Sequence, residues 1–179
     1  MAFKTFYTSV TTLLFGVGIL LTVPAAHAGV WVQGGFSFLQ STETQGGTSE
    51  TRIRTLTTLT GGYRFVQGFF VGAQYLFSRD SATPSSAWAI GPKGGFQYGG
   101  FEFTAAYLPI ARDSYAAGVR TGNGFALNLG YAWEITGPLR LGFYVTYWTV
   151  TYAKLNGADL FIRPQVNYIS PQLALVFAF

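Results

Sequence analysis

Asn167–Phe179 reads NYISPQLALVFAF and alternates bulky apolar residues with smaller or more polar ones. In steps of two back from the end, one set is Phe179, Phe177, Leu175, Leu173, Pro171 and Ile169, and the other is Ala178, Val176, Ala174, Gln172, Ser170 and Tyr168. A period of two is the side-chain period of a β-strand. The segment therefore predicts a strand with one apolar face that ends on an aromatic residue.

The same alternation, bounded by turn-forming residues, recurs along the chain. It is clearest in segment 123–135, where Phe125, Leu127 and Leu129 share one face and Ala126 and Asn128 share the other. Segment 52–65 is rich in threonine and shows it least clearly. We expect eight strands, at 30–40, 52–65, 69–79, 86–98, 101–111, 123–135, 139–152 and 165–179.

The connections between these segments alternate in length. Short turns are expected at 66–68, 99–100 and 136–138, and longer polar loops at 41–51, 80–85, 112–122 and 153–164. Antiparallel neighbours reverse direction at every connection. All short turns therefore lie at one end of the predicted sheet and all long loops at the other.

The composition does not fit an ordinary water-facing domain. Charged residues make up 10% of the chain and aromatic residues 18%, whereas a soluble domain carries about 25% charged residues. After residue 28, no stretch is long and apolar enough for a transmembrane helix. A closed barrel, in which strands satisfy each other's backbone groups, is then the remaining way to cross a bilayer. We predict an all-β, eight-stranded, antiparallel up-and-down transmembrane β-barrel over residues 29–179.

Residues 1–28 have the pattern of a cleaved signal peptide. Lys4 supplies a positive start, Leu13–Val23 is an apolar core, and Ala26-His27-Ala28 is a cleavage site of the A-x-A form. The alternative is an anchoring helix, for which the core is short. Cleavage leaves 151 residues with a net charge of +3 and without the single histidine and the single methionine.

The residue inventory of the mature chain limits its chemistry. The absence of cysteine excludes disulfides, thiolate metal sites and a thiol nucleophile. A charge of +3 without a basic cluster does not predict binding to nucleic acid. We therefore expect no metal, no cofactor and no nucleic-acid partner.

A soluble barrel of the lipocalin type would have the opposite facing, with an apolar interior. The low charge content favours an apolar exterior, and the Gly-, Ala-, Ser- and Thr-rich face suits the narrow lumen of eight strands. Aromatic residues also fall at two levels, as in the interfacial girdles of membrane barrels. One level, beside the short turns, holds Phe65, Phe69, Tyr98, Phe101, Trp133 and Phe179; the other, toward the long loops, holds Phe38, Tyr75, Trp88, Tyr107 and Phe125.

Three prolines lie inside predicted strands, at Pro92, Pro109 and Pro171. Proline has no backbone N–H to donate, and a closed barrel has no free edge on which to place it. We expect a bulge or a missing ladder bond at each of them.

These features together resemble the small outer-membrane barrels of Gram-negative bacteria, in the class of OmpX, the OmpA transmembrane domain and OmpW. The leader, the alternation and the terminal strand ending at Phe179 carry the resemblance across essentially all of the mature chain. It implies export to the outer membrane, recognition of the last strand by the barrel-assembly machinery, and a monomer among outer-membrane lipids and lipopolysaccharide. The chain lacks the peptidoglycan-binding domain of OmpA and has short loops, so the expected role is structural, in envelope integrity.

The more polar face carries charges that we expect to meet inside the barrel. An ion-pair network of this kind would plug the lumen and fix the strand register, because buried charges must be paired. The alternative is a selectivity ring in a narrow channel. The residues concerned are Arg54, Arg64, Lys93, Glu102, Glu134 and Arg140, with Glu134 expected opposite Arg140.

A second basic set lies near the long loops. Arginine forms charge-assisted hydrogen bonds with phosphate, so these residues are candidates for contacts with lipopolysaccharide; the alternative is solvated loop charge. The set is Arg79, Arg112, Arg120, Lys154 and Arg163.

The sequence leaves two other functions as alternatives. A transporter resembling OmpW would pass small apolar molecules sideways into the membrane through the wall near Pro109, and Tyr144, Trp148 and Tyr152 would line its pocket. Barrel enzymes such as lipid A acylases, deacylases and omptins imply a histidine base, which the mature chain lacks. Asp80-Ser81 and Asp113-Ser114 are ordinary turn formers, so we expect no catalysis.

Overall fold

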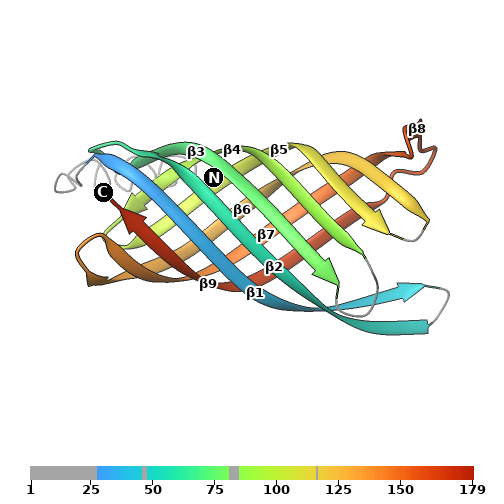
Figure 1. Ribbon diagram of the computed structural model, residues 1–179, viewed down its shortest axis with the longest axis horizontal. Coiled ribbons are helices and arrows are strands. Elements are labelled where there is room, and N and C mark those ends of the chain that lie inside the picture. The colour runs from blue at the N-terminus through green and yellow to red at the C-terminus, as the bar shows by residue number, and fades with distance from the viewer. Residues whose placement is uncertain (1–27, 46–47, 81–84, 116) are drawn as a thin grey trace, which may run out of the picture.

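The computed structural model describes residues 28–45, 48–80, 85–115 and 117–179. The expected signal peptide therefore lies outside the described residues, except for Ala28. The described chain is a single antiparallel sheet wound into a barrel (Figure 1). Its strands are β1 (Gly29–Gln45), β2 (Thr48–Arg64), β3 (Phe69–Asp80), β4 (Ser86–Tyr98), β5 (Phe101–Tyr115), β6 (Gly118–Thr136), β7 (Leu139–Leu155), β8 (Ala158–Asp159) and β9 (Gln165–Ala178).

Eight of these strands form the closed ring. Their order is β6-β5-β4-β3-β2-β1-β9-β7, and pairing of β6 with β7 completes the circuit. The two-residue strand β8 pairs only with the end of β7. The predicted eight-stranded up-and-down barrel is confirmed. Within the described ranges, no helix is long and apolar enough to cross a membrane.

The strands run further than the sequence pattern predicted. β1 and β2 stay paired up to Gln45 and Thr48, and β5 and β6 up to Tyr115 and Gly118. The loops expected at 41–51 and 112–122 are therefore mostly strand. Apolar alternation fades in these polar stretches, but a backbone ladder needs only N–H and C=O groups.

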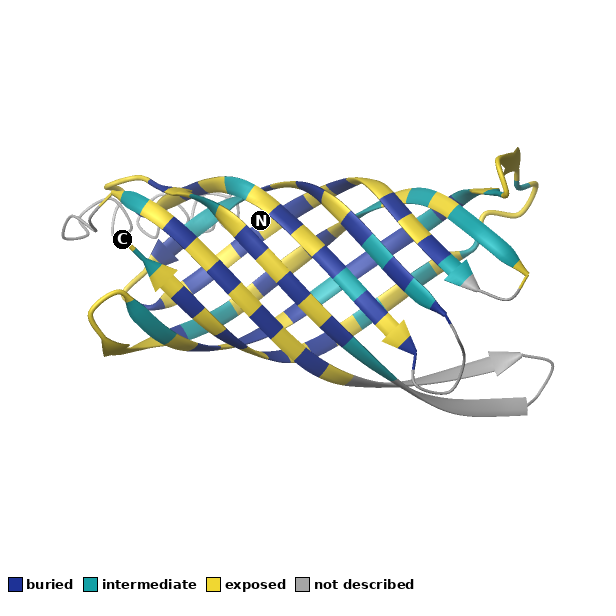
Figure 2. Ribbon diagram, viewed as in Figure 1, coloured by how far each residue is buried: buried dark blue, intermediate teal, exposed yellow. Residues whose placement is uncertain are grey.

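The two faces of the sheet are oriented as predicted, which gives the checkerboard of Figure 2. On β6, Leu129 is 59% exposed, whereas its neighbour Asn128 is 4% exposed. The aromatic residues of both expected levels face outward, and near the short turns Phe101 packs edge-on against Tyr131, with ring centroids 4.7 Å apart. The lipocalin-like arrangement is thereby excluded.

Pro92 and Pro109 lie at one irregularity, as expected. The β4–β5 register shifts between Ile90 and Lys93, and the β5–β6 register shifts between Leu108 and Ala111. Leu108 and Ala111 are buried while Pro109 and Ile110 between them are both exposed. This is a bulge in β5, and it reverses which residues of the strand point into the barrel beyond it.

The β1–β9 ladder is short, and Pro171 explains where it ends. It covers Trp31 to Phe36 against Ala178 to Leu173, although β9 stays paired with β7 as far as Gln165. The Phe179 amide donates to the Val30 carbonyl at 2.9 Å and the Ala178 amide donates to Pro138, so odd-numbered positions of β9 point toward β1. The next rung would require an amide at Pro171, which has none.

Candidate functional site

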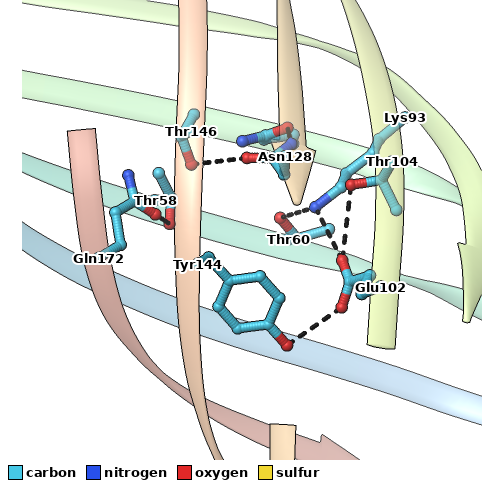
Figure 3. Close-up of polar contacts among 10 residues, drawn as sticks. Thr58, Thr60, Lys93, Glu102, Thr104, Asn128, Tyr144, Thr146 and Gln172 are labelled. Carbon is cyan, nitrogen blue, oxygen red and sulfur yellow. Dashed lines mark hydrogen bonds and ion pairs between the residues drawn. The ribbon is translucent and has the colours of Figure 1, made fainter. Parts of the chain in front are cut away.

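A buried ion pair lies in the lumen toward the short-turn end. Lys93 on β4 and Glu102 on β5 approach to 3.6 Å, and their side chains are 1% and 3% exposed. The Tyr144 hydroxyl on β7 donates to the second carboxylate oxygen of Glu102 at 3.1 Å (Figure 3). Two of the predicted network residues thus meet, and Tyr144 joins them instead of lining a pocket.

Further groups complete the surroundings of this pair. The Lys93 ammonium donates to the Thr60 hydroxyl on β2 at 3.5 Å and lies 5.4 Å from the centre of the Trp31 ring on β1. The Thr104 hydroxyl donates to Glu102 at 3.5 Å. Groups from five strands therefore converge on one charged pair, which we call the Lys93–Glu102 cluster. A pair held this way resists separation, because either charge alone would be buried without compensation.

Amide and hydroxyl groups form a neutral layer beside this cluster. The Thr146 hydroxyl donates to the Asn128 carbonyl oxygen at 2.8 Å, and the Asn128 amide donates to Gln74 at 3.4 Å. Thr58 donates to Gln172 at 3.2 Å, as Figure 3 shows. Polar groups buried without water require such partners.

An apolar layer follows toward the long-loop end. Leu56, Leu76, Leu108, Trp148 and Val150 are each at most 2% exposed and belong to one cluster that also holds Tyr152. Trp148 stacks on Tyr168 with ring centroids 4.9 Å apart. The expected pocket of Tyr144, Trp148 and Tyr152 is therefore filled by its own side chains, because all three are at most 3% exposed.

Two more ion pairs lie above the apolar layer. Arg54 approaches Asp80 at 3.6 Å and also donates to the Tyr168 hydroxyl. Arg120 donates to Asp113 at 2.8 Å, and its guanidinium lies 5.2 Å from the centre of the Tyr152 ring. Arg54 has the inward position that we predicted, but Arg120 does not belong to the outer set: it turns into the barrel.

At the short-turn end, the predicted charges do not form one network. Arg64 is buried and donates to Gln97 at 2.8 Å. Glu134 pairs in register with Arg140, as predicted. However, Glu134 is exposed, and the described residues give it no ion pair. Glu134 stands at the strand end, where water competes for its charge, so its place in the buried network is a wrong prediction.

A small cavity of about 10 Å³ lies near this end, among Trp31, Arg64, Phe70, Gln97 and Glu102. This volume accommodates about one water molecule. It is far below the few hundred Å³ of an ordinary ligand pocket.

The other outer cations have the exposed positions that we expected. Arg79, Arg112, Lys154 and Arg163 are all exposed near the long-loop end. The register places Arg112 opposite Thr121, and Thr121 opposite Lys154.

Sequence reasoning missed Asp80 and Asp113, which it treated as turn residues. Asp80 continues the inward set of β3 after Gln74, Leu76 and Ser78, so extending the strand by one residue would have identified it. Asp113 becomes inward only because of the β5 bulge, which the sequence signals through Pro109 but does not locate. Among the described residues, no group of three acidic, histidine or cysteine side chains could hold a metal ion.

Comparison with known proteins supports the fold. No protein-family model matches the sequence, and no curated protein matches it. Among solved structures, the crystal structure of Neisserial surface protein A is similar, with a TM-score of 0.59 and 16% sequence identity over 86% of this chain and 100% of that one. At this identity the likeness concerns the fold alone.

Proposed function

We propose that the protein is an integral outer-membrane barrel with a structural role in the cell envelope, and that packed side chains close its lumen. The observation that carries the proposal is the lumen itself. The inward side chains of the Lys93–Glu102 cluster and of the apolar layer are almost fully buried, which supports a closed lumen.

The outer surface supports the membrane location. Large apolar side chains such as Leu129, Phe103 and Leu173 are 56–62% exposed on the barrel wall, which water would disfavour and lipid would accept. Aromatic residues border this wall at both ends, where membrane barrels place their interfacial girdles. The barrel-assembly machinery would engage β9 as the last strand, and the folded barrel would act as a monomer.

The transport alternative gains no support from the wall near Pro109. Leu108 is 0% exposed and Ala111 is 2% exposed on either side of the bulge. Gly91 lies so close to the Tyr107 carbonyl and to Pro109 that a Cβ atom at position 91 would collide with both. The bulge is therefore closely packed rather than open.

Recording from the refolded protein in planar lipid bilayers tests the closed lumen. Because two filled layers lie in series, we expect no stable conductance, while a heat-modifiability gel shows the compact barrel. Discrete, long-lived channel openings from protein that passes the gel test would contradict the proposal.

Substitution of Leu129 tests the membrane-facing wall. An arginine on the lipid face near the bilayer midplane costs about 2–4 kcal/mol, so Leu129→Arg should insert poorly into liposomes. Glu134→Arg, at an exposed strand end of the same strand, is the matched control and should insert normally. Equal insertion of both variants would mean that Leu129 does not face lipid.

A further inference from the structure

The register of the barrel creates an outward polar row that the linear sequence conceals. Arg112 on β5, Thr121 on β6 and Lys154 on β7 are consecutive partners across two ladders, and all three are exposed. Paired residues of an antiparallel ladder project on the same face. We call these three residues the cation row.

The cation row borders an apolar surface. Ile110, on the β5 bulge, lies two residues before Arg112, and nearby Tyr107 pairs with Phe125. These three side chains are 46–57% exposed. The outer wall of the barrel thus changes from apolar to cationic within a few residues. A surface that contacts both the acyl chains and the anionic head group of a lipid would show the same change.

The loop after β8, the short strand that pairs with β7 at Lys154, adds two exposed apolar side chains. Phe161 is 103% exposed and Ile162 is 79% exposed, the largest values among the exposed large apolar residues of the described chain. The loop is held in place at both ends, because the Leu160 amide donates to Ala153 at 2.8 Å and the Tyr152 amide donates to Pro164 at 3.0 Å. Figure 1 shows this segment projecting at the end of the barrel.

The charges around the cation row favour an anion. Arg163 is a further exposed cation in the loop after β8, and Asp159 is the acidic residue opposite Lys154 in the strand register. Lys154 and Asp159 form no ion pair within the part of the chain that the structure describes. The ammonium of Lys154 and the guanidinium of Arg112 are therefore available to an external group.

We propose that the cation row binds the head group of a glycolipid that carries two phosphates. Arg112 and Lys154 are two strand spacings apart, about 10 Å, which suits two anionic groups on one sugar head better than a single phosphate. Arg112 offers a bidentate fork and Lys154 a point charge, with the Thr121 hydroxyl between them for a sugar hydroxyl. The acyl chains lie against Ile110 and its apolar neighbours, and Phe161 and Ile162 insert beside them.

This inference rests on the proposed membrane location and names the lipid that the outer rim would take. The probe is a fluorescent diglucosamine lipid with two phosphates, titrated into refolded protein in neutral detergent micelles. Its monophosphorylated and dephosphorylated forms, and a phospholipid with one phosphate, are the comparison ligands. We expect affinity to fall in the order bisphosphorylated, monophosphorylated, dephosphorylated, and to weaken as salt is added.

Substitutions distinguish lipid binding by the cation row from non-specific attraction to surface charge. Arg112→Gln with Lys154→Gln should weaken binding of the bisphosphorylated lipid by about tenfold, equivalent to about 1.4 kcal/mol. Arg140→Gln removes a cation at the short-turn end of β7, far from the row. It is the control and should bind like the unaltered protein. Phe161→Ser with Ile162→Ser should weaken all four lipids alike.

Equal binding of the double glutamine variant, or of the dephosphorylated lipid, would overturn the inference. A heat-modifiability gel and liposome insertion are measured on every variant. If the protein inserts normally but binds the lipids equally with and without phosphate, only the glycolipid site is disproved. If the unaltered protein fails to insert, the proposed function is disproved.

Discussion

At the scale of single residues, the stability of the packed lumen depends on pairing its buried charges. Lys93 and Glu102 are buried together. Tyr144 donates a hydrogen bond to the Glu102 carboxylate, and Thr60 accepts one from the Lys93 ammonium. Replacement of a whole buried pair by apolar residues of similar size is often neutral, whereas removal of one partner is strongly destabilising. The Lys93–Glu102 cluster should therefore show non-additive mutational effects.

We expect Glu102→Ala to destabilise the barrel by about 3–5 kcal/mol, because Lys93 would stay buried without its partner. Lys93→Met combined with Glu102→Leu should recover most of that loss. The measurement is urea-induced unfolding in lipid bilayers. Glu134→Ala, which removes an exposed glutamate, is the control and should change the free energy of unfolding very little. An additive double variant would show that the pair is not coupled.

At the scale of elements, the bulge in β5 decides where two charges point. Before the bulge, odd-numbered residues such as Tyr107 face outward; after it, Ala111 and Asp113 are buried and Arg112 is exposed. Without the inserted residue, Asp113 would face outward and Arg112 would face into the barrel. One local irregularity thus provides both the partner of Arg120 in the lumen and the first cation of the outer row.

The end of the β1–β9 ladder is a second consequence of a proline. Pro171→Ala restores an amide directed at β1, opposite Phe38, and we expect the ladder to gain a rung worth about 1 kcal/mol net. Hydrogen exchange at Phe38 should then become slower. Pro109→Ala, in the bulge, is the control and should leave exchange at Phe38 unchanged. No change in either variant would mean that Pro171 does not limit the ladder.

The sequence predicts the strands well wherever bulky and small residues alternate, since that period reflects the facing of the sheet. It predicts strand ends poorly in polar stretches, because the ladder between Gln45 and Thr48 requires no apolar side chain. Of the candidate site, Lys93 and Glu102 were identified together, because alternation places both inward. Asp113 is missed because its facing depends on the position of the β5 bulge, which alternation cannot locate. Arg120 is missed because the strand is expected to begin only at residue 123, although the inward alternation of β6 continues from Asn128 to Arg120.

At the scale of the whole molecule, the inward side chains form layers along the barrel axis. The charged cluster, the amide layer, the apolar layer and the outer ion pairs follow one another from the short-turn end to the long-loop end. The closed lumen that we propose would then have several seals in series, each able to block it alone. Opening a single layer should therefore not create a channel.

This arrangement predicts a threshold in conductance. Lys93→Ser with Glu102→Ser, or Trp148→Ala with Leu56→Ala, should each remain non-conducting in planar bilayers. The four substitutions together should give measurable current if the barrel still passes the heat-modifiability gel. Current from either pair alone would show that one layer carries the whole seal.

The hydrogen bond from Phe179 to Val30 brings the first and last strands together at one rim. A short peptide linker could join these positions, and new termini could be opened at the Gly99-Gly100 turn between β4 and β5. Such a circular permutant would keep every neighbour relation in the ring. The fold would then be a property of the closed circle, independent of which strand leaves the ribosome first.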